Sequence, residues 1–347
     1  MKKHKNIPFF TPHSGCKNSC VFCSQVKITG KESTEYEIDD EVKSLKNTID
    51  ESLATIKNAN TQLAFFGGSF TGIERHRMIA LLETVFSYVK NGKINSIRVS
   101  TRPDYIDQSI LDTLREYAVT DIELGIQSIN DKVLRACARG HNSSIVYKSA
   151  ELIIKNGFNL AGQMMVGLPQ STLNEEIQTA DAIINMGATG ARIYPTVVFE
   201  GTVLYDMVIR GLYKPITNEE AVERCARVLD RFVSAGVNIL KIGLHSSENL
   251  ARAEYGANHP AIGELVKAKL YYLRISEILK NMDCRKKQIE IRVSDKEKSK
   301  LLGHGRQIIN DLIREFDLAG VDVVIAKNEI FKPIIRIKDG KQCVSNQ

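Results

Sequence analysis

The sequence has no apolar run long enough to cross a membrane. A membrane-spanning helix needs roughly 20 consecutive apolar residues, and no stretch of the chain approaches that length. The basic N-terminus, residues 1–6, is followed only by a short apolar run at residues 7–10, too short for the core of a secretory signal peptide. We therefore expect a cytoplasmic protein with no membrane partner.

The chain also lacks a strong charge imbalance. Its 347 residues include 47 Lys and Arg against 41 Asp and Glu, a formal net charge of +6, and 43% of them are hydrophobic. This composition is ordinary for a globular protein and excludes a disordered tail, a collagen-like repeat and a disulfide-dense miniprotein. Most of the excess charge lies in residues 285–347, which hold 14 Lys and Arg against 9 Asp and Glu. This basic C-terminal segment is a candidate surface for phosphate contacts.

The cysteines are too few and too unevenly spaced for a disulfide framework. There are seven, and an odd count in a reducing compartment favours metal or redox chemistry. Cys16, Cys20 and Cys23 form a C-x-x-x-C-x-x-C pattern, which suits zinc or an iron–sulfur cluster. A structural zinc site usually draws on a second ligand pair, which is missing here, and His13 lies only three residues before Cys16. The remaining cysteines are isolated and are expected to be structural: Cys137, Cys225, Cys284 and Cys343.

Short apolar runs alternate with helical patterns over the first 245 residues. The expected strands are residues 7–11, 62–66, 96–101, 121–126, 159–166, 190–194 and 238–243. Apolar residues recur at helical spacing between them, at residues 77–90, 106–117, 144–156, 173–186 and 219–235. Such alternation predicts βαβ units and a parallel sheet, because parallel neighbours need a crossover. We expect an α/β fold with a partial or complete parallel β/α barrel, and an open doubly wound sheet is the alternative.

The pattern changes after residue 245. A long helix is expected at residues 260–282 and a helical segment at residues 294–316, interrupted by Gly303-His304-Gly305. Strands are expected at residues 288–293, 321–326 and 330–337. We therefore expect the barrel domain in residues 1–245, and a helical linker with a small basic α+β domain in residues 246–347.

Polar and glycine residues fall at the ends of several expected strands. The carboxyl ends of parallel strands meet at one edge of the sheet, where α/β folds place their ligand sites. A single Gly or Ser there indicates only a turn, whereas several on one rim indicate a shared site. The motifs at these ends are Gly67-Gly68-Ser69, Ser100-Thr101-Arg102, Gln127-Ser128 and Gly167-Leu168-Pro169.

The cysteine loop and five later motifs resemble those of radical S-adenosylmethionine (SAM) enzymes. The loop has the aromatic Phe22 before its third cysteine, and the motifs at residues 66–70, 100–104, 123–128, 139–141 and 165–169 follow in the family's order. Within that superfamily the chain is most similar to the radical SAM domain of the Elongator catalytic subunit and its small bacterial relatives. It is more distantly similar to oxygen-independent coproporphyrinogen oxidases. The Elongator subunit carries an acetyltransferase domain after this part, and we expect this chain to lack one.

The resemblance implies an enzyme with two cofactors. It implies that Cys16, Cys20 and Cys23 hold a [4Fe–4S] cluster whose fourth iron chelates the amino and carboxylate groups of SAM. Reductive cleavage of SAM at such a cluster gives methionine and a 5′-deoxyadenosyl radical, which the protein shields from water and oxygen.

Further SAM contacts are implied around the cluster loop. Phe22 is expected beside the adenine, and Arg139 on the methionyl carboxylate. Gln127 and Gln163 are expected on the ribose hydroxyls. The other expected contacts are Gly67, Gly68, Ser69, Ser100, Val166 and Gly167. Each has a structural alternative as a turn glycine, a core side chain or a solvated arginine.

Three functions remain open from the sequence. The first is a radical SAM enzyme that modifies tRNA or another RNA, bound through the basic C-terminal segment and reduced by a protein such as ferredoxin or flavodoxin. The second is a radical SAM enzyme with a small-molecule substrate, and the third is a non-catalytic protein with a structural metal at the three cysteines. Residues expected on the substrate side are Arg192, Tyr194, Tyr205 and His245.

Overall fold

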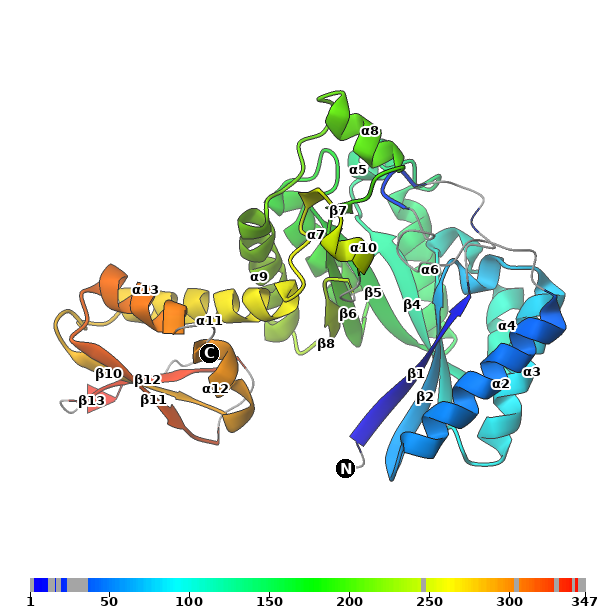
Figure 1. Cartoon of the computed structure of the whole chain (residues 1–347), viewed down its shortest axis with the longest axis horizontal. Coiled ribbons are helices and arrows are strands. Elements are labelled where there is room, and N and C mark those ends of the chain that lie inside the picture. The colour runs from blue at the N-terminus through cyan, green and yellow to red at the C-terminus, as the bar shows by residue number, and fades with distance from the viewer. Residues whose placement is uncertain are drawn as a thin grey trace.

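A seven-stranded parallel sheet dominates the computed structural model, which describes residues 3–11, 16, 20–23, 37–244, 248–302, 306–327, 331–338 and 341–342 (Figure 1). The spatial order of the strands follows the chain, with no reversal of the kind that an open doubly wound sheet requires. In the described residues the first and last strands each pair with one neighbour, so the curled sheet is a partial barrel. The strands are β1 (Lys3–Thr11), β2 (Ala59–Gly67), β3 (Ser96–Thr101), β4 (Val119–Gln127), β5 (Asn159–Val166), β6 (Gly190–Pro195) and β8 (Asn238–Ile242).

Helices cover the outer face of this sheet (Figure 1). Successive strand residues point to opposite faces, so Ile97 and Val99 enter the apolar core under the helices while Arg98 and Ser100 face the interior of the partial barrel. The helices between the strands are α2 (Ile38–Thr55), α3 (Arg75–Lys90), α4 (Gln108–Glu116), α5 (Asp131–Ala136), α6 (Ser143–Lys155), α7 (Leu173–Asn185), α8 (Val203–Ile209) and α9 (Asn218–Ser234). Short elements complete this part: the 3-10 turns η1 (Phe70–Gly72) and η2 (Pro103–Tyr105), the paired strands β7 (Val197–Val198) and β9 (Tyr255–Gly256), and α10 (Glu248–Ala251).

Local sequence signals explain where several helices begin. Thr172 and Thr217 form capping boxes with Glu175 and Glu220 at the starts of α7 and α9. Sequence analysis did not predict α2, whose buried stripe is narrow and includes a charged residue. That residue, Glu41, binds Arg77 of α3 through two hydrogen bonds of 2.6 and 2.7 Å, so this helix depends on a tertiary ion pair.

A second, four-stranded sheet follows with the order β11-β10-β12-β13. Helix α11 packs against α9 on one side and against α12 and α13 on the other. The expected strand at residues 330–337 was too long: β12 begins after Pro333, which has no amide hydrogen for a ladder. The interruption expected at residues 303–305 lies outside the described residues. The elements are α11 (Ile262–Lys280), β10 (Gln288–Val293), α12 (Asp295–Leu302), α13 (Gln307–Phe316), β11 (Gly320–Ile325), β12 (Ile334–Ile337) and β13 (Lys341–Gln342).

None of the described helices combines the length and apolar character needed to span a bilayer.

Candidate cofactor site

A cavity of about 250 Å³ lies where the strands of the large sheet end. It brings together eleven residues that the sequence predicted for cofactor binding, from segments far apart in the chain. They are Cys16, Cys20, Phe22, Cys23, Gly67, Gly68, Ser69, Ser100, Gln127, Arg139 and Gln163. Three further lining residues had no predicted cofactor contact: Thr101 and Arg102, which belong to a predicted strand-end motif, and Gly125.

The other two predicted residues, Val166 and Gly167, do not line this cavity. They lie at the end of β5, where the Gly167 amide donates to the Glu176 carboxylate at 2.6 Å and its carbonyl accepts from the Tyr213 hydroxyl. Both backbone groups of Gly167 are thus engaged within the protein. A SAM contact at these two positions stays a prediction.

Backbone hydrogen bonds fix the described part of the cysteine loop. The Cys23 amide donates to the Cys20 carbonyl at 3.0 Å, which closes a tight turn between these two cysteines. The intervening Val21 donates to the Cys137 carbonyl at 3.2 Å and accepts from the Leu204 amide at 2.8 Å. These bonds attach the turn to the end of α5 and the start of α8.

The donor chemistry of the loop fits an iron–sulfur cluster. Burial, with the neighbouring Cys20 and Cys16, raises the pKa of the Cys23 thiol to about 12, and the arginines 139 and 102 act in the opposite direction. Within the described residues, no group of three or more His, Cys, Asp or Glu is gathered around a point suited to a single metal ion.

Buried polar atoms without partners also indicate a ligand-binding cavity. Gln127 adopts the left-handed conformation with φ of +65°, and its buried side-chain oxygen has no hydrogen-bond partner among the described residues. The Nε atom of Arg139 is likewise buried and unpartnered, whereas its Nη1 donates to Cys20 Sγ at 3.2 Å and its Nη2 to the Gly125 carbonyl at 2.5 Å. Unsatisfied buried groups are rare in native proteins, so two on lining residues fit a polar cofactor.

Gly67 has a packing role of its own. Its φ is +114°, and a Cβ atom at this position would collide with the carbonyl oxygen of Thr11. That oxygen accepts a hydrogen bond of 3.2 Å from the Gly68 amide. The close approach of β1 to the end of β2 therefore requires glycine, and a contact with the methionyl amino group stays a prediction.

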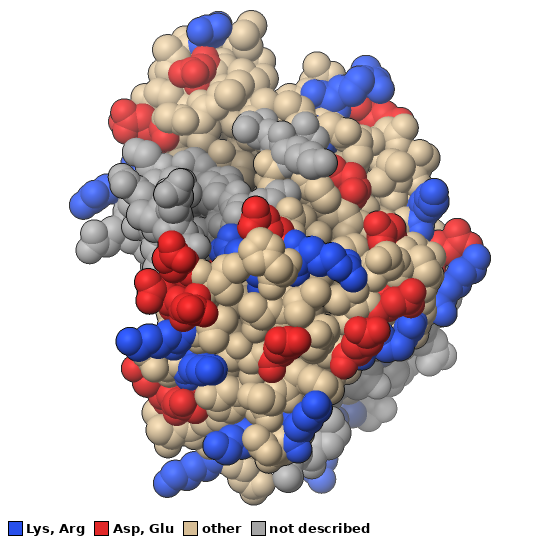
Figure 2. All heavy atoms as spheres, turned by 90° about the vertical axis from the view of Figure 1, so that its right-hand side faces the viewer, with Lys and Arg blue, Asp and Glu red and all other residues tan. Residues whose placement is uncertain are grey.

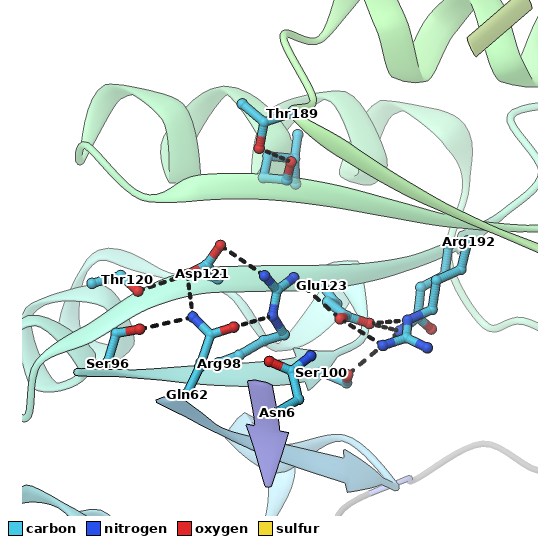
Figure 3. A network of polar contacts seen from close by, with 12 residues as sticks. Asn6, Gln62, Ser96, Arg98, Ser100, Thr120, Asp121, Glu123, Thr189 and Arg192 are labelled. Atoms are coloured by element: carbon cyan, nitrogen blue, oxygen red, sulfur yellow. Dashed lines mark hydrogen bonds and ion pairs between the residues drawn. The ribbon is translucent and has the colours of Figure 1, made fainter. Parts of the chain in front are cut away.

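A buried polar network lies below the cavity, inside the partial barrel (Figure 3). Its centre is Glu123, which is fully buried. Its carboxylate accepts from Arg192 at 2.6 and 3.0 Å, from Arg98 at 3.2 Å and from the Gln163 amide nitrogen at 2.8 Å. Gln163 also donates to Ser100 Oγ at 3.4 Å, so the network reaches the cavity wall.

The network continues away from the cavity through Arg98. This guanidinium also binds Asp121 at 3.0 Å and the side-chain oxygen of Gln62 at 2.8 Å, and Gln62 donates to Ser96 at 2.9 Å (Figure 3). Sequence analysis missed this network, because alternating polar residues in a strand are typical of a solvated face. In a barrel the same alternation places them inside.

Two of the residues expected on the substrate side lie on β6. Arg192 stacks over the Phe66 ring, with 4.9 Å from the guanidinium carbon to the ring centroid. Burial raises the pKa of Tyr194. Tyr205 lies beside Tyr255, with the ring centroids 6.0 Å apart, and His245 lies outside the described residues.

Acidic neighbours neutralise much of the basic C-terminal segment. Buried Glu297, for example, binds Lys300 at 3.1 Å. The opposite side of the molecule, which carries α2 to α4, likewise has positive and negative side chains interspersed (Figure 2). The other paired residues of the segment are Arg285 with Asp317, Lys287 with Asp283, Arg292 with Glu290, Arg314 with Asp311 and Lys338 with Asp322.

Two curated proteins are similar to part of this chain. The tRNA uridine(34) acetyltransferase of Methanocaldococcus infernus is 34% identical over 128 residues, which are 36% of this chain and 24% of that protein. Human Elongator complex protein 3 is 34% identical over 140 residues, 40% of this chain and 26% of that protein. The matched part thus spans about a quarter of the length of these relatives.

A solved structure and two family models extend the comparison. The archaeal Elp3 of Methanocaldococcus infernus superposes with a TM-score of 0.57 at 21% identity, over 82% of this chain and 65% of that one, and so shares the fold. The Radical_SAM C-terminal domain model matches residues 188–272. The model of the radical SAM superfamily matches residues 10–183, half of the chain, and this range includes the three cysteines and every residue that lines the cavity. The chain belongs to the radical SAM superfamily and is an enzyme of that superfamily.

Proposed function

We propose that this protein holds a [4Fe–4S] cluster on Cys16, Cys20 and Cys23 and binds SAM beside it in the same cavity. The observation that supports this most directly is one cavity lined by three thiols and by two residues with unpartnered buried atoms, Gln127 Oε1 and Arg139 Nε. Such a cluster, when bound, supplies the electron that cleaves the SAM sulfonium to methionine and a 5′-deoxyadenosyl radical.

The chain's own residues would hold and orient SAM. Arg139 Nε offers a charged donor to the methionyl carboxylate, and Gln127 Oε1 offers an acceptor to a ribose hydroxyl. Gln163 is held at the cavity wall by its bonds to Glu123 and Ser100, which fix the direction of its amide. The remaining assigned contacts are Phe22, Gly67, Gly68 and Ser69, all of which line the cavity.

A small apolar cluster would keep water from the cysteine turn. Phe22 packs with buried Val21, Leu168 and Leu204, so α8 and the end of β5 cover the loop from one side. Shielding matters here because a primary carbon radical would abstract hydrogen from any C–H bond that reached it and would combine with dioxygen. The protein's contribution is therefore to bind, orient and shield the cofactor.

We further propose tRNA as the substrate, with cytoplasmic ferredoxin or flavodoxin as the electron donor. The support is the similarity to the archaeal relative, which is a tRNA uridine(34) acetyltransferase. Within the basic segment, α12 offers Lys296 and Lys298, which have no acidic partner in the part of the chain that the structure describes.

The cofactor proposal is tested by anaerobic reconstitution. The wild-type protein should bind about four irons and four sulfides and release 5′-deoxyadenosine from SAM under a strong reductant. Cys20→Ala should lose both properties. Cys284→Ala is the matched control, because this cysteine is buried in the core away from the cavity and should leave the iron content unchanged. A wild-type protein that binds zinc and no iron under these conditions would contradict the proposal.

The substrate proposal is tested on tRNA from the organism. Nucleosides from a deletion strain should lack one modification that the parent strain has, and the complemented strain should regain it. Complementation with Cys20→Ala should fail. Identical nucleoside profiles in parent and deletion strains would contradict a tRNA substrate and leave the cofactor proposal intact.

A further inference from the structure

Two guanidinium groups lie against the sulfur of Cys20. Arg139 Nη1 donates to this Sγ atom at 3.2 Å, and Arg102 Nη1 lies 3.5 Å from it. Both arginines are 4% exposed, so water does little to screen their charge. Arg102 follows the end of β3, 82 residues after Cys20 in the chain. Arg139 lies in the segment after α5, 119 residues after Cys20.

The two arginines are fixed in place by a chain of hydrogen bonds. Asp104 binds Arg102 through two bonds of 2.9 Å, a bidentate geometry that orients the guanidinium plane. Arg102 in turn donates to the backbone carbonyl of Arg139, whose side chain is anchored on Gly125. Asp104 therefore positions Arg102, and Arg102 positions Arg139, relative to the sulfur.

This environment distinguishes Cys20 from the other two cysteines. The described contact of Cys16 Sγ is a neutral one, to Ser69 Oγ at 3.6 Å. Asp104 balances the charge of Arg102, whereas Arg139 has no acidic partner among the described residues. Two N–H donors thus face the Cys20 sulfur, whereas the positive charge of both arginines also reaches Cys23.

We propose that Arg102, held by Asp104, tunes the reduction potential of the cluster through Cys20. Hydrogen bonds to cysteine sulfurs and nearby positive charge stabilise the more negative, reduced state, and so raise the potential. Arg102 acts on the cluster indirectly, through its contact with the Cys20 sulfur and by holding Arg139 in place, so it is a positioning residue. The inference rests on the proposed cluster, but the residues to which it assigns the tuning, Arg102 and Asp104, are not among the proposed SAM contacts.

The test is a redox titration of the reconstituted protein, without SAM, followed by electron paramagnetic resonance of the reduced cluster. Arg102→Gln should lower the midpoint potential. At a fixed solution potential, the ratio of reduced to oxidised cluster should fall at least tenfold, which corresponds to a shift of about 59 mV for one electron. Arg102→Lys keeps the charge but not the bidentate bond to Asp104, and should give a smaller shift in the same direction.

The control is Arg77→Gln, which breaks another buried bidentate pair, with Glu41, between α2 and α3. It should leave the midpoint potential unchanged. Failure of the wild type to assemble a cluster would overturn the proposed function. A cluster that assembles normally, with the same potential in the wild type, Arg102→Gln and Arg102→Lys, would overturn only the tuning role. If Arg102→Gln does not retain its cluster, the midpoint potential of Arg102→Lys decides. A value below that of the wild type supports the tuning role, and an equal value overturns it.

Discussion

Replacement of Glu123 by glutamine tests the buried network that supports the cavity. The substitution keeps the size and shape of the side chain but removes its negative charge. In the native structure this carboxylate is fully buried and accepts four hydrogen bonds, two of them from Arg192. Arg98 keeps a second carboxylate, Asp121, at 3.0 Å, whereas Arg192 loses its acidic partner.

The expected loss of stability follows from the charge of Arg192, which stays buried without an acidic partner. Arg192 has a side chain only 10% exposed, so water cannot replace the lost carboxylate. Removing one member of a buried pair costs about 3–5 kcal/mol, because the other charge stays buried and uncompensated. We expect the free energy of unfolding to fall by that amount.

Urea unfolding followed by far-UV circular dichroism measures this change, since the chain has no tryptophan for fluorescence. Asp112→Asn is the control: its pair with Arg115 is 3.0 Å long but half exposed, and its loss should cost about 0.2–1 kcal/mol. If Glu123→Gln costs no more than Asp112→Asn, the network does not stabilise the barrel interior in the way described here.

Three further predictions concern other parts of the chain. Gly67→Ala should lower the free energy of unfolding by about 2–3 kcal/mol, because φ is +114° at this position and the added Cβ would collide with β1. Gly92→Ala is the control: φ is +66° there but the space is open, so the cost in the same urea assay should be about 1 kcal/mol. The hydrogen bond from the Ser143 amide lowers the pKa of Asp131 below its ordinary 3.8. The ionised Asp131 therefore stabilises the folded protein above pH 3.8, and this contribution is lost as the pH falls through the lowered pKa. The stability difference between wild type and Asp131→Asn should therefore shrink from pH 7 to pH 3, and a constant difference would refute the assignment. Joint replacement of Lys296 and Lys298 by alanine should weaken tRNA binding and reduce the slope of log affinity against log salt by about 2, measured by filter binding at several salt concentrations; an unchanged slope would exclude α12 from the RNA contact.

The sequence predicted the large sheet well because its signals are local. Each expected strand of the partial barrel is present, since apolar runs of five to eight residues and the helical patterns between them depend on near neighbours only. One of the elements that it missed, α2, is held by the Glu41–Arg77 pair, whose partners lie 36 residues apart. The strand that it overextended, β12, was limited by Pro333, a local signal that the apolar run concealed.

The three cysteines, the glycine after β2 and the polar strand ends were determined by the sequence alone. Their spacing is short, and parallel strands bring their carboxyl ends to one edge whatever the details of packing. Only the tertiary structure decided which charges meet there. The contacts of Arg139 and Arg102 with Cys20, and of Arg192 with Glu123, join residues 119, 82 and 69 positions apart. They depend on strand register, such as the pairing of Ser100 with Glu123 and of Gly125 with Gln163, which no local pattern specifies.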